Sequence, residues 1–280
     1  MLTNAQFDRT RRLALRLAGI ELFERHRELL GRRSRRLGVQ DGAGLDALLN
    51  AAEEGDLTAN RHLVGMVTTK FTGFFRHSHH FEIAAGHALR TMHRRGQTRL
   101  WSAAAATGEE PYSLAATLME VFQRDDPPAS ILATDIDVDA LEVAQRGEYG
   151  EAALRGIEPA RRGRFFAETA AARWSITPAV RRLLEFRALN LASVAWPVEG
   201  PFDVIFCRNM LMYLESCHRY AALERMASLL APDGVLFLDP AEHLGKAAHW
   251  FTAGADGVYA RRTTAGHARS RHSTTLRIAL

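Results

Sequence analysis

The sequence predicts an α/β fold in which a doubly wound sheet follows a small helical module. From residue 99 onward, short apolar runs that suit buried strands alternate with segments of helical periodicity. The clearest unit is Arg99–Phe122, RLWSAAAATGEEPYSLAATLMEVF, which predicts a strand, a tight turn and a helix. Before residue 99 the pattern is helical instead. With 280 residues, 47% of them hydrophobic, the chain can bury one large core beside a smaller helical one.

The helical module is predicted to be strongly basic. Residues 5–30 have helical periodicity, with a break expected at Gly31, because glycine weakens a helix by about 1 kcal/mol. Residues 45–54 and 62–67 suggest two more short helices. Residues 1–40 hold ten arginines and four acidic residues, a net charge of +6, whereas the whole chain carries +4. Such a patch implies an acidic partner (nucleic acid, an anionic membrane surface or an acidic protein), and a merely solvated helix face is the alternative.

The turn after the first strand has the features of a ligand-binding loop. Gly108 permits backbone angles that other residues avoid, and the small residues at 103–106 let a ligand approach the backbone closely. Pro111 suits the first turn of the following helix. The full GxGxxG pattern is absent, so a simple packing turn is the alternative.

Further strands follow along the chain, and polar residues recur at their ends. Residues 202–209, FDVIFCRN, form the clearest buried strand, and a helix is predicted over 210–230. The other strands are expected at 131–137, 184–189, 235–239 and 258–262. A doubly wound sheet brings the carboxyl ends of its strands to one edge, so these end residues favour a nucleoside-type ligand there: Asp135, Asn190, Asn209 and Asp239.

The acids that end the second strand are candidates for binding a ribose. In doubly wound folds an acid at this place binds ribose hydroxyls, since a carboxylate accepts two hydrogen bonds from a diol. Asp135 is the better candidate, because Asp137 and Asp139 can instead cap the helix of residues 140–146.

Composition and spacing argue against several kinds of site. Two cysteines, Cys207 and Cys217, and no CxxC pair speak against a disulfide framework and a zinc site, and favour a reducing cytoplasm. No apolar run approaches the roughly 18 residues that a membrane span needs. His77, His79 and His80 invite a metal site, but no carboxylate or cysteine lies at chelating distance in the sequence, so a helical linker is preferred.

Five blocks of the sequence, taken together, resemble the chemotaxis receptor methyltransferases of the CheR family. They are TTKFTGFFR at 68–76, WSAAAATGEEPYSLA at 101–115, ILATDIDVDALEVAQRGEYG at 131–150, FDVIFCRNMLMYL at 202–214 and LLAPDGVLFL at 229–238. The resemblance implies the Rossmann-like sheet of a SAM-dependent methyltransferase, mostly parallel with an antiparallel last strand. It also implies a helical domain at 1–80, a methyltransferase domain at 81–263 with a small β-subdomain inserted at about 150–186, and a basic tail at 264–280.

The resemblance further implies the reaction and the residues that serve it. The enzyme would esterify glutamate side chains of chemoreceptors, using S-adenosylmethionine (SAM) and releasing S-adenosylhomocysteine (SAH), without a metal. Arg76 and Tyr213 take the catalytic roles. The residues implied to contact the cofactor are Lys70, Thr72, Arg76, Ala104, Gly108, Glu109, Asp135, Asn190, Leu191 and Asn209. The implied docking surface for the acidic, helical bundle of the receptor is basic: Arg25, Arg32, Arg33, Arg35 and Arg36.

These residue types suit the implied chemistry. A glutamate carboxylate, with an ordinary pKa of about 4.3, is already a nucleophile at neutral pH, so no general base is needed. Catalysis then consists mostly of holding oxygen, methyl and sulfur in line. Arg76 can hold the substrate carboxylate in a charge-assisted pair, and Tyr213 can orient the same oxygen or the methyl. We expect a cytoplasmic monomer. We expect no nucleic-acid partner, because the arginine-rich helix lacks interleaved aromatic residues that could stack on bases.

Three departures from the family pattern bear on the cofactor. Lys70 stands where asparagine is usual and puts a cation near the expected sulfonium, unless its long stem turns to solvent. The block DPAE, residues 239–242, replaces GHSE, and Ala106 replaces a serine. Two alternatives therefore stay open: a SAM- or SAH-binding regulatory module without methyl transfer, and a methyltransferase for another substrate. Residues 167–186 are shorter than in members that bind a receptor's C-terminal peptide, so we expect no need for that tether.

Overall fold

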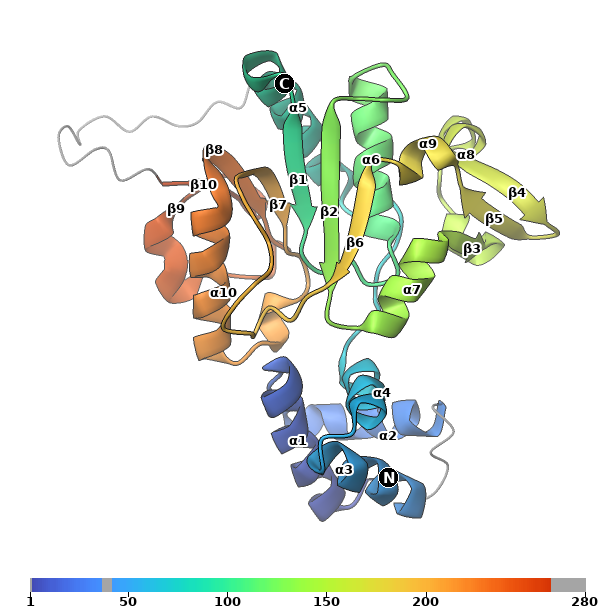
Figure 1. The fold of residues 1–280 in the computed structure, drawn as a ribbon, viewed down its shortest axis with the longest axis vertical. Helices are drawn as coiled ribbons and strands as arrows, with labels where there is room; N and C mark the ends of the chain where they lie inside the picture. Colours follow the sequence, from blue (N-terminus) through green and yellow to red (C-terminus); the bar gives the residue numbers. More distant parts are fainter. Residues whose placement is uncertain (1, 37–41, 263–280) are drawn as a thin grey trace.

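The computed structural model describes residues 2–36 and 42–262, which form N-terminal helices, a seven-stranded sheet and a three-stranded sheet (Figure 1). The large sheet has the strand order β6-β2-β1-β7-β8-β10-β9. Strands β6, β2, β1, β7 and β8 run parallel, and β10 is antiparallel to β8 and β9. The predicted doubly wound sheet with an antiparallel last strand is thus confirmed. Its strands are β1 (Thr98–Ser102), β2 (Ala129–Asp135), β6 (Leu184–Ala188), β7 (Phe202–Phe206), β8 (Leu230–Phe237), β9 (Phe251–Ala253) and β10 (Val258–Arg261).

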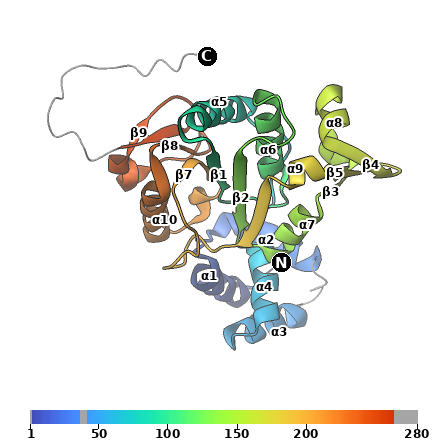
Figure 2. The same ribbon diagram turned by 45° about the horizontal axis from the view of Figure 1, so that its top comes forward.

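Helices cover both faces of this sheet. Helices α5 (Ser78–Arg95) and α6 (Glu109–Val121) pack on one face and α10 (Ser216–Leu229) on the other (Figure 2). Side chains alternate between the two cores along each strand, so Leu100 joins the α5–α6 core and Trp101 joins the α10 core. Helix α7 (Val138–Arg146) follows β2 and contacts β2 and β6.

Several elements begin or end away from their predicted bounds. β7 stops at Phe206 although the predicted strand continued to Asn209, because the chain turns out of the ladder and Asn209 adopts a φ of +58°. The predicted helix over 210–230 is a short 3₁₀ turn, η3 (Leu211–Tyr213), followed by α10. A second 3₁₀ helix, η4 (Gly245–Trp250), precedes β9.

The helical module consists of α1 (Asn4–Ala18), the turn η1 (Glu24–His26), α2 (Arg27–Arg36), α3 (Gly42–Glu53) and α4 (Leu57–Val67). The predicted single helix over 5–30 was wrong, because α1 ends at Gly19, whose φ is +65°. A side chain at Gly19 would also overlap the Cβ of Ala192. The break expected at Gly31 was wrong too. Gly31 lies inside α2 and lets Leu2 pack closely, since a Cβ there would be 3.2 Å from Leu2 Cδ1.

The expected small β-subdomain lies between α7 and β6, at one side of the large sheet (Figure 1). Its strands pair antiparallel in the order β3-β5-β4. The elements of this segment are β3 (Glu148–Gly150), η2 (Glu151–Leu154), α8 (Pro159–Phe165), β4 (Phe166–Ala170), β5 (Arg173–Ile176) and α9 (Pro178–Arg181).

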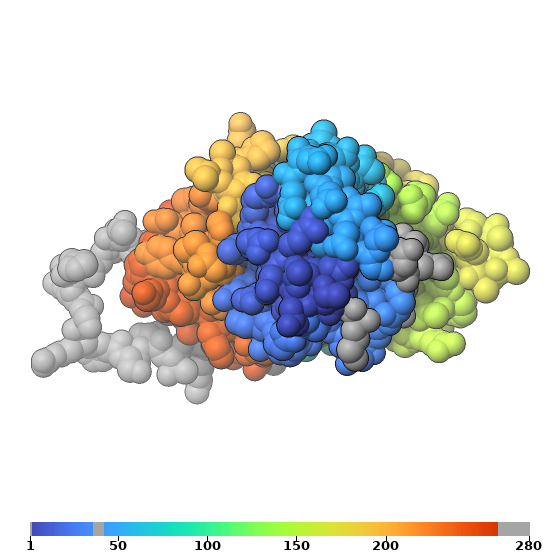
Figure 3. All heavy atoms as spheres, turned by 90° about the horizontal axis from the view of Figure 1, so that it is seen from below, coloured from blue at the N-terminus to red at the C-terminus, as the bar shows by residue number. Residues whose placement is uncertain are grey.

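The parallel strands all end at the same end of the molecule, and the helical module covers the central part of that end (Figures 1 and 3). The chain after α1 pairs with the chain before α10: the Glu21 N–H donates to the Tyr213 carbonyl at 2.9 Å and the Glu215 N–H to the Gly19 carbonyl at 2.9 Å. None of the helices in the described ranges combines the length and apolarity that a membrane span requires. The predicted tail at 264–280 lies outside the described residues.

Candidate active site

A cavity of about 260 Å³ lies at the carboxyl edge of the large sheet, next to the helical module. The lining residues come from the linker before α5, from the strand ends and the segments that follow them, and from the helical module at Ile20 and Val67. Six of the predicted site residues are in its wall: Thr72, Arg76, Ala104, Asp135, Asn209 and Tyr213. The wall also contains residues outside the predicted set, among them Ile20, Glu110, Ile136, Arg208 and Met210.

Asp135 reaches the cavity because β2 ends at this residue. Its two carboxylate oxygens each accept one backbone hydrogen bond, Oδ2 from the Ala106 N–H at 2.8 Å and Oδ1 from the Asp137 N–H at 2.9 Å. Burial raises the pKa of Asp135. Each oxygen keeps an unused lone pair, so the carboxylate can still accept from the two hydroxyls of a diol. Asp137, by contrast, accepts the Ala140 N–H through Oδ1 at 3.0 Å and so caps α7. Helix capping was the alternative to ribose binding that the sequence left open for Asp137.

Arg76 supplies a partly exposed positive charge at the cavity wall. Its guanidinium carbon lies 4.8 Å from the centre of the Phe71 ring, and Nη1 donates to the Phe71 carbonyl at 3.3 Å. Nη2 is 3.9 Å from Asp239 Oδ2, too far for a direct hydrogen bond. Arg76 therefore keeps donors available for an anionic group.

A buried ion pair that the sequence did not predict forms part of the same wall. The Arg208 Nε donates to Glu110 Oε2 at 2.7 Å, and their side chains are only 4% and 8% exposed. The Ser102 hydroxyl donates to the other Glu110 oxygen at 2.8 Å, and Arg208 Nη1 donates to the Arg76 carbonyl at 2.9 Å. The pair thus ties the first turn of α6 to the loop after β7.

The loop after β7 is held by the two acids of the DPAE block. Glu242 accepts the backbone N–H groups of Asn209 at 2.9 Å, Asp239 at 3.0 Å and Met212 at 3.2 Å. Burial raises the pKa of Glu242. Asp239 Oδ2 accepts the side-chain amide of Asn209 at 2.7 Å, and its Oδ1 accepts the Ala241 N–H at 3.0 Å. Glu242 is common to this block and to the expected GHSE pattern, so the departure adds one contact to Asn209, the hydrogen bond from its side-chain amide to Asp239.

Comparison with known proteins identifies the family. A family model described as CheR methyltransferase, SAM binding domain, matches residues 70–258. The chain is 37% identical over 264 residues to chemotaxis protein methyltransferase 2 of Pseudomonas aeruginosa, covering 92% of this chain and 93% of that protein. It is 36% identical over 267 residues to the chemotaxis protein methyltransferase of Escherichia coli, covering 92% and 91%. This chain belongs to the CheR methyltransferase family. The resemblance seen in the sequence blocks is confirmed.

Five of the predicted cofactor contacts in this CheR family member lie outside the cavity wall, and Lys70 is the fifth, after Asn190, Leu191, Gly108 and Glu109. The Asn190 Nδ2 donates to the Leu17 carbonyl at 2.8 Å and so holds the end of α1. Leu191 packs in the core on the α10 face. Gly108, with a φ of +99°, lets α6 begin close to Ala144 and the Tyr149 hydroxyl. Glu109 accepts a hydrogen bond from the Thr107 hydroxyl at 2.7 Å, and burial raises the pKa of Glu109. The glutamate of this motif that lines the cavity is the next residue, Glu110.

Lys70 also lies outside the wall and has found a counter-charge. Its Nζ is 3.1 Å from Asp137 Oδ2, an oxygen that the Thr68 hydroxyl also contacts at 2.9 Å. Asp137 is 3% exposed, and Lys70 is 41% exposed. The cation that was expected near the sulfonium is therefore drawn toward the start of α7.

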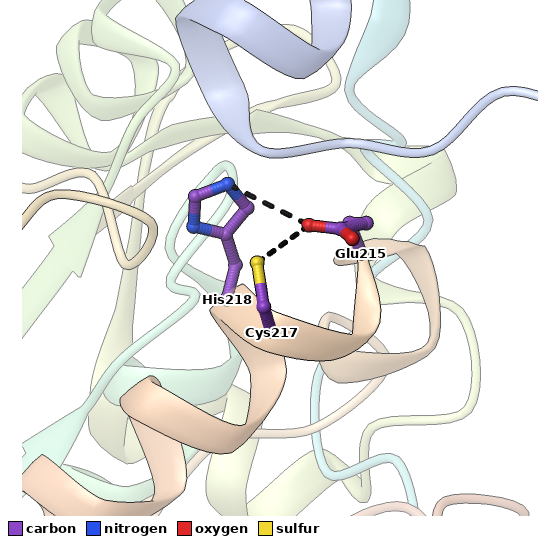
Figure 4. Close-up of side chains that lie close together, drawn as sticks. All are labelled: Glu215, Cys217 and His218. Atoms are coloured by element: carbon purple, nitrogen blue, oxygen red, sulfur yellow. Dashed lines mark hydrogen bonds and ion pairs between the residues drawn. The ribbon is translucent and has the colours of Figure 1, made fainter.

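The histidines at 77, 79 and 80 pack at the start of α5. The His80 Nε2 lies 2.6 Å from the Asp256 carbonyl, and burial lowers the pKa of His80 to about 4. Burial also lowers the pKa of His77. Among residues 2–36 and 42–262, the group able to offer three metal ligands is a different one, Glu215, Cys217 and His218 (Figure 4). There the Cys217 thiol donates to Glu215 Oε2 at 2.6 Å, and His218 Nε2 is 3.9 Å from the same oxygen.

The arginines predicted to dock a partner are not equivalent. Arg32 and Arg35 are exposed on α2. Arg33 instead donates to the carbonyls of Met66 at 3.1 Å and Thr68 at 2.5 Å, so it ties α2 to the end of α4. Arg25 lies over the Phe23 ring at 4.6 Å. The side chain of Arg36 lies outside the described part of the structure.

Proposed function

We propose that this chain is a protein-glutamate O-methyltransferase that uses SAM to esterify glutamate side chains of methyl-accepting chemoreceptors and releases SAH. One observation carries the proposal. The cavity at the carboxyl edge brings together a carboxylate at the end of β2, Asp135, and a cation, Arg76, in a chain similar to chemotaxis methyltransferases over 92% of its length.

The cavity wall suits the cofactor that the family implies. Asp135 offers acceptors for the ribose hydroxyls, and the small side chains of Ala104 and Ala106 leave the backbone accessible beside it. Ile20, Ile136 and Met210 supply apolar surface. When bound, SAM supplies a methyl group on a positively charged sulfonium.

The acceptor side needs orientation rather than proton transfer. A glutamate carboxylate is ionised at neutral pH, so Arg76 can pair with one of its oxygens while the other points at the methyl. The Tyr213 hydroxyl can donate to the attacking oxygen, and the hydrogen bond from Glu21 to the Tyr213 carbonyl fixes the turn that carries it. Alignment of this kind supplies much of the rate enhancement in displacement reactions.

The exposed arginines of α2, Arg32 and Arg35, suit an acidic partner. In our proposal they meet the acidic surface of the helical bundle of the receptor while a glutamate side chain enters the cavity. Arg33 belongs to the fold of the module, because two backbone carbonyls occupy its guanidinium.

Transfer of a labelled methyl group from SAM to a cytoplasmic chemoreceptor fragment tests the proposal. We expect base-labile label on the fragment with the wild type, and rates lower by about tenfold or more with Arg76→Ala and Asp135→Ala. Asp135→Ala should weaken SAM binding, and Arg76→Ala should raise the KM for the fragment. Arg124→Ala, which removes an exposed arginine paired with Asp126, serves as the matched control. Absence of label, despite calorimetric binding of SAM, would contradict the proposal and favour a regulatory module.

A further inference from the structure

The side-chain amide of Asn209 has its orientation fixed by a partner behind the cavity wall. Asn209 lines the cavity, whereas Asp239 does not and is 7% exposed. The Asn209 Nδ2 lies 2.7 Å from Asp239 Oδ2. An ionised carboxylate can only accept hydrogen bonds, so the amide must turn its NH₂ group toward Asp239.

The charge state of Asp239 supports this orientation. Burial alone would raise the pKa of Asp239, but hydrogen bonds from the Ala241 N–H and the Asn209 amide, with Arg76 and His77 nearby, hold it below its ordinary value. The carboxylate is therefore ionised at neutral pH. Within the described residues, no donor reaches the Asn209 Oδ1, which is the end of the amide left for the cavity.

We propose that Asp239 is a positioning residue that turns the Asn209 carbonyl oxygen into the cavity and thereby raises the affinity of the site for positively charged SAM relative to neutral SAH. The inference rests on the proposed function, since it concerns the same cavity. An acceptor oxygen backed by a buried negative charge attracts a sulfonium and its polarised methyl group, and it gains nothing from the uncharged thioether of the product. This contribution to the affinity ratio favours exchange of product for fresh SAM.

The hydrogen bonds of Asp239 make one substitution unusually informative. In Asp239→Asn the new side chain has one oxygen and one NH₂ group. Its oxygen must face the Ala241 N–H, because that backbone donor cannot turn round. Its NH₂ group then faces Asn209, which must reverse its amide to offer an acceptor, and the cavity receives a donor in place of an oxygen.

A second substitution should reverse the effect. In the double variant Asp239→Asn with Asn209→Asp, residue 239 donates to a carboxylate at 209, and the other carboxylate oxygen faces the cavity. The polarity of the pair is exchanged while the oxygen in the cavity is restored. Asp203→Asn is the matched control: Asp203 is also buried and accepts from the Arg99 N–H at 2.8 Å, but it lies at the opposite end of β7.

The measurement is the affinity of the full chain for SAM and for SAH, by calorimetry on each variant. We expect Asp239→Asn to lower the ratio of SAM affinity to SAH affinity by about tenfold, or about 1.4 kcal/mol, and the double variant to restore it. Asn209→Ala, which removes the cavity oxygen and leaves Asp239 in place, should lower the same ratio and guards against misfolding of Asp239→Asn. Asp203→Asn should leave the ratio unchanged.

Equal weakening of SAM and SAH binding in Asp239→Asn, or no recovery in a folded double variant, would overturn the inference and leave Asp239 a purely structural residue. A wild-type chain that binds neither SAM nor SAH would instead overturn the proposed function. The two failures are therefore distinguishable.

Discussion

Replacing Glu110 by glutamine is expected to lower the free energy of unfolding by about 3 kcal/mol, because it leaves the buried Arg208 guanidinium without its counter-charge. The Nε–Oε2 distance is 2.7 Å, and the side chains are 4% and 8% exposed. Removing one member of a buried pair costs about 3–5 kcal/mol. Glutamine keeps the size of the side chain and can still accept from Nε, so the lower end of that range applies.

Within the described residues, Arg208 has no second anion nearby to replace Glu110 as its ion-pair partner. Its other contacts are the Arg76 carbonyl, the His80 Nδ1 at 3.5 Å, and the rings of Phe81 and Phe206, 5.2 and 5.3 Å from the guanidinium carbon. Ring faces compensate a buried cation only in part, by about 0.5–2 kcal/mol. The charge left by Glu110→Gln therefore stays mostly uncompensated.

Glu109→Gln provides the matched control for this prediction. Glu109 is the preceding residue of the same helix turn and is equally buried, but its carboxylate accepts from the Thr107 hydroxyl rather than from a cation. Its loss should cost about 1 kcal/mol or less, the size of an interaction with a helix N-terminus. Urea unfolding gives both free energies, provided that the m-values agree. Equal costs for the two variants would refute the assignment of Arg208–Glu110 as a stabilising buried pair.

Further predictions concern pH, the linker and the receptor. Lowering the pH from 7.5 to 5 should reduce the free energy of unfolding by about 2 kcal/mol through His80. The pKa of His80 is about 4 in the folded chain and 6.5 ordinarily, so the unfolded chain takes up a proton first as the pH falls. Urea unfolding of His80→Gln should show no such loss. Lys70→Met should change SAM affinity by calorimetry less than about twofold, because the Lys70 ammonium faces Asp137, and a tenfold change would contradict this. Arg32→Glu with Arg35→Glu should slow receptor methylation at low salt, less so at high salt, with SAM affinity unchanged. Receptor fragments with and without their C-terminal peptide should be methylated at equal rates, and tight binding of the isolated peptide would contradict this.

The sheet was predictable because strands buried on both faces read as nearly continuous apolar runs. The runs of β2 and β7 located both strands correctly. Their ends were less predictable, since an apolar run does not show where the chain leaves the ladder. At Asn209 the positive φ that ends the pairing is held by Glu242, which lies 33 residues further along the chain.

The helix break in the N-terminal module shows the same limitation. Gly19 and Gly31 look alike in the sequence, and both weaken a helix. Gly19 ends α1 because Ala192 of the methyltransferase domain leaves no room for a side chain there. Gly31 continues α2 because the missing side chain admits Leu2. The choice between them depends on contacts that no local pattern contains.

Residues at strand ends were the most predictable part of the site, although the position alone does not fix the role. Asp135 ends β2 and Asn190 follows β6, but of the two only Asp135 lines the cavity, because the Asn190 amide donates to the Leu17 carbonyl. Glu110 and Arg208 carried a signal that could have found them. Glu110 comes after β1, and Arg208 comes after β7, the parallel strand next to it. The two residues carry opposite charges, and the carboxyl edge of the sheet brings them together.

The departures from the family pattern at Lys70 and Asp239 would destabilise the fold or the site only if these residues had no partners. Lys70 lies beside Asp137, a carboxylate whose burial would be unfavourable without a partner, so the lysine satisfies a need of the fold. Asp239 brings a buried charge whose two oxygens are satisfied by Ala241 and Asn209. The two positions differ in one respect: Asp137, the partner of Lys70, is not part of the cavity wall, whereas Asn209, the partner of Asp239, is. If the ratio of SAM affinity to SAH affinity differs between this chain and its relatives, Asp239 is the position that should produce the difference. A family pattern that records one residue at a time cannot show this effect, because it depends on the pairing of Asp239 with Asn209.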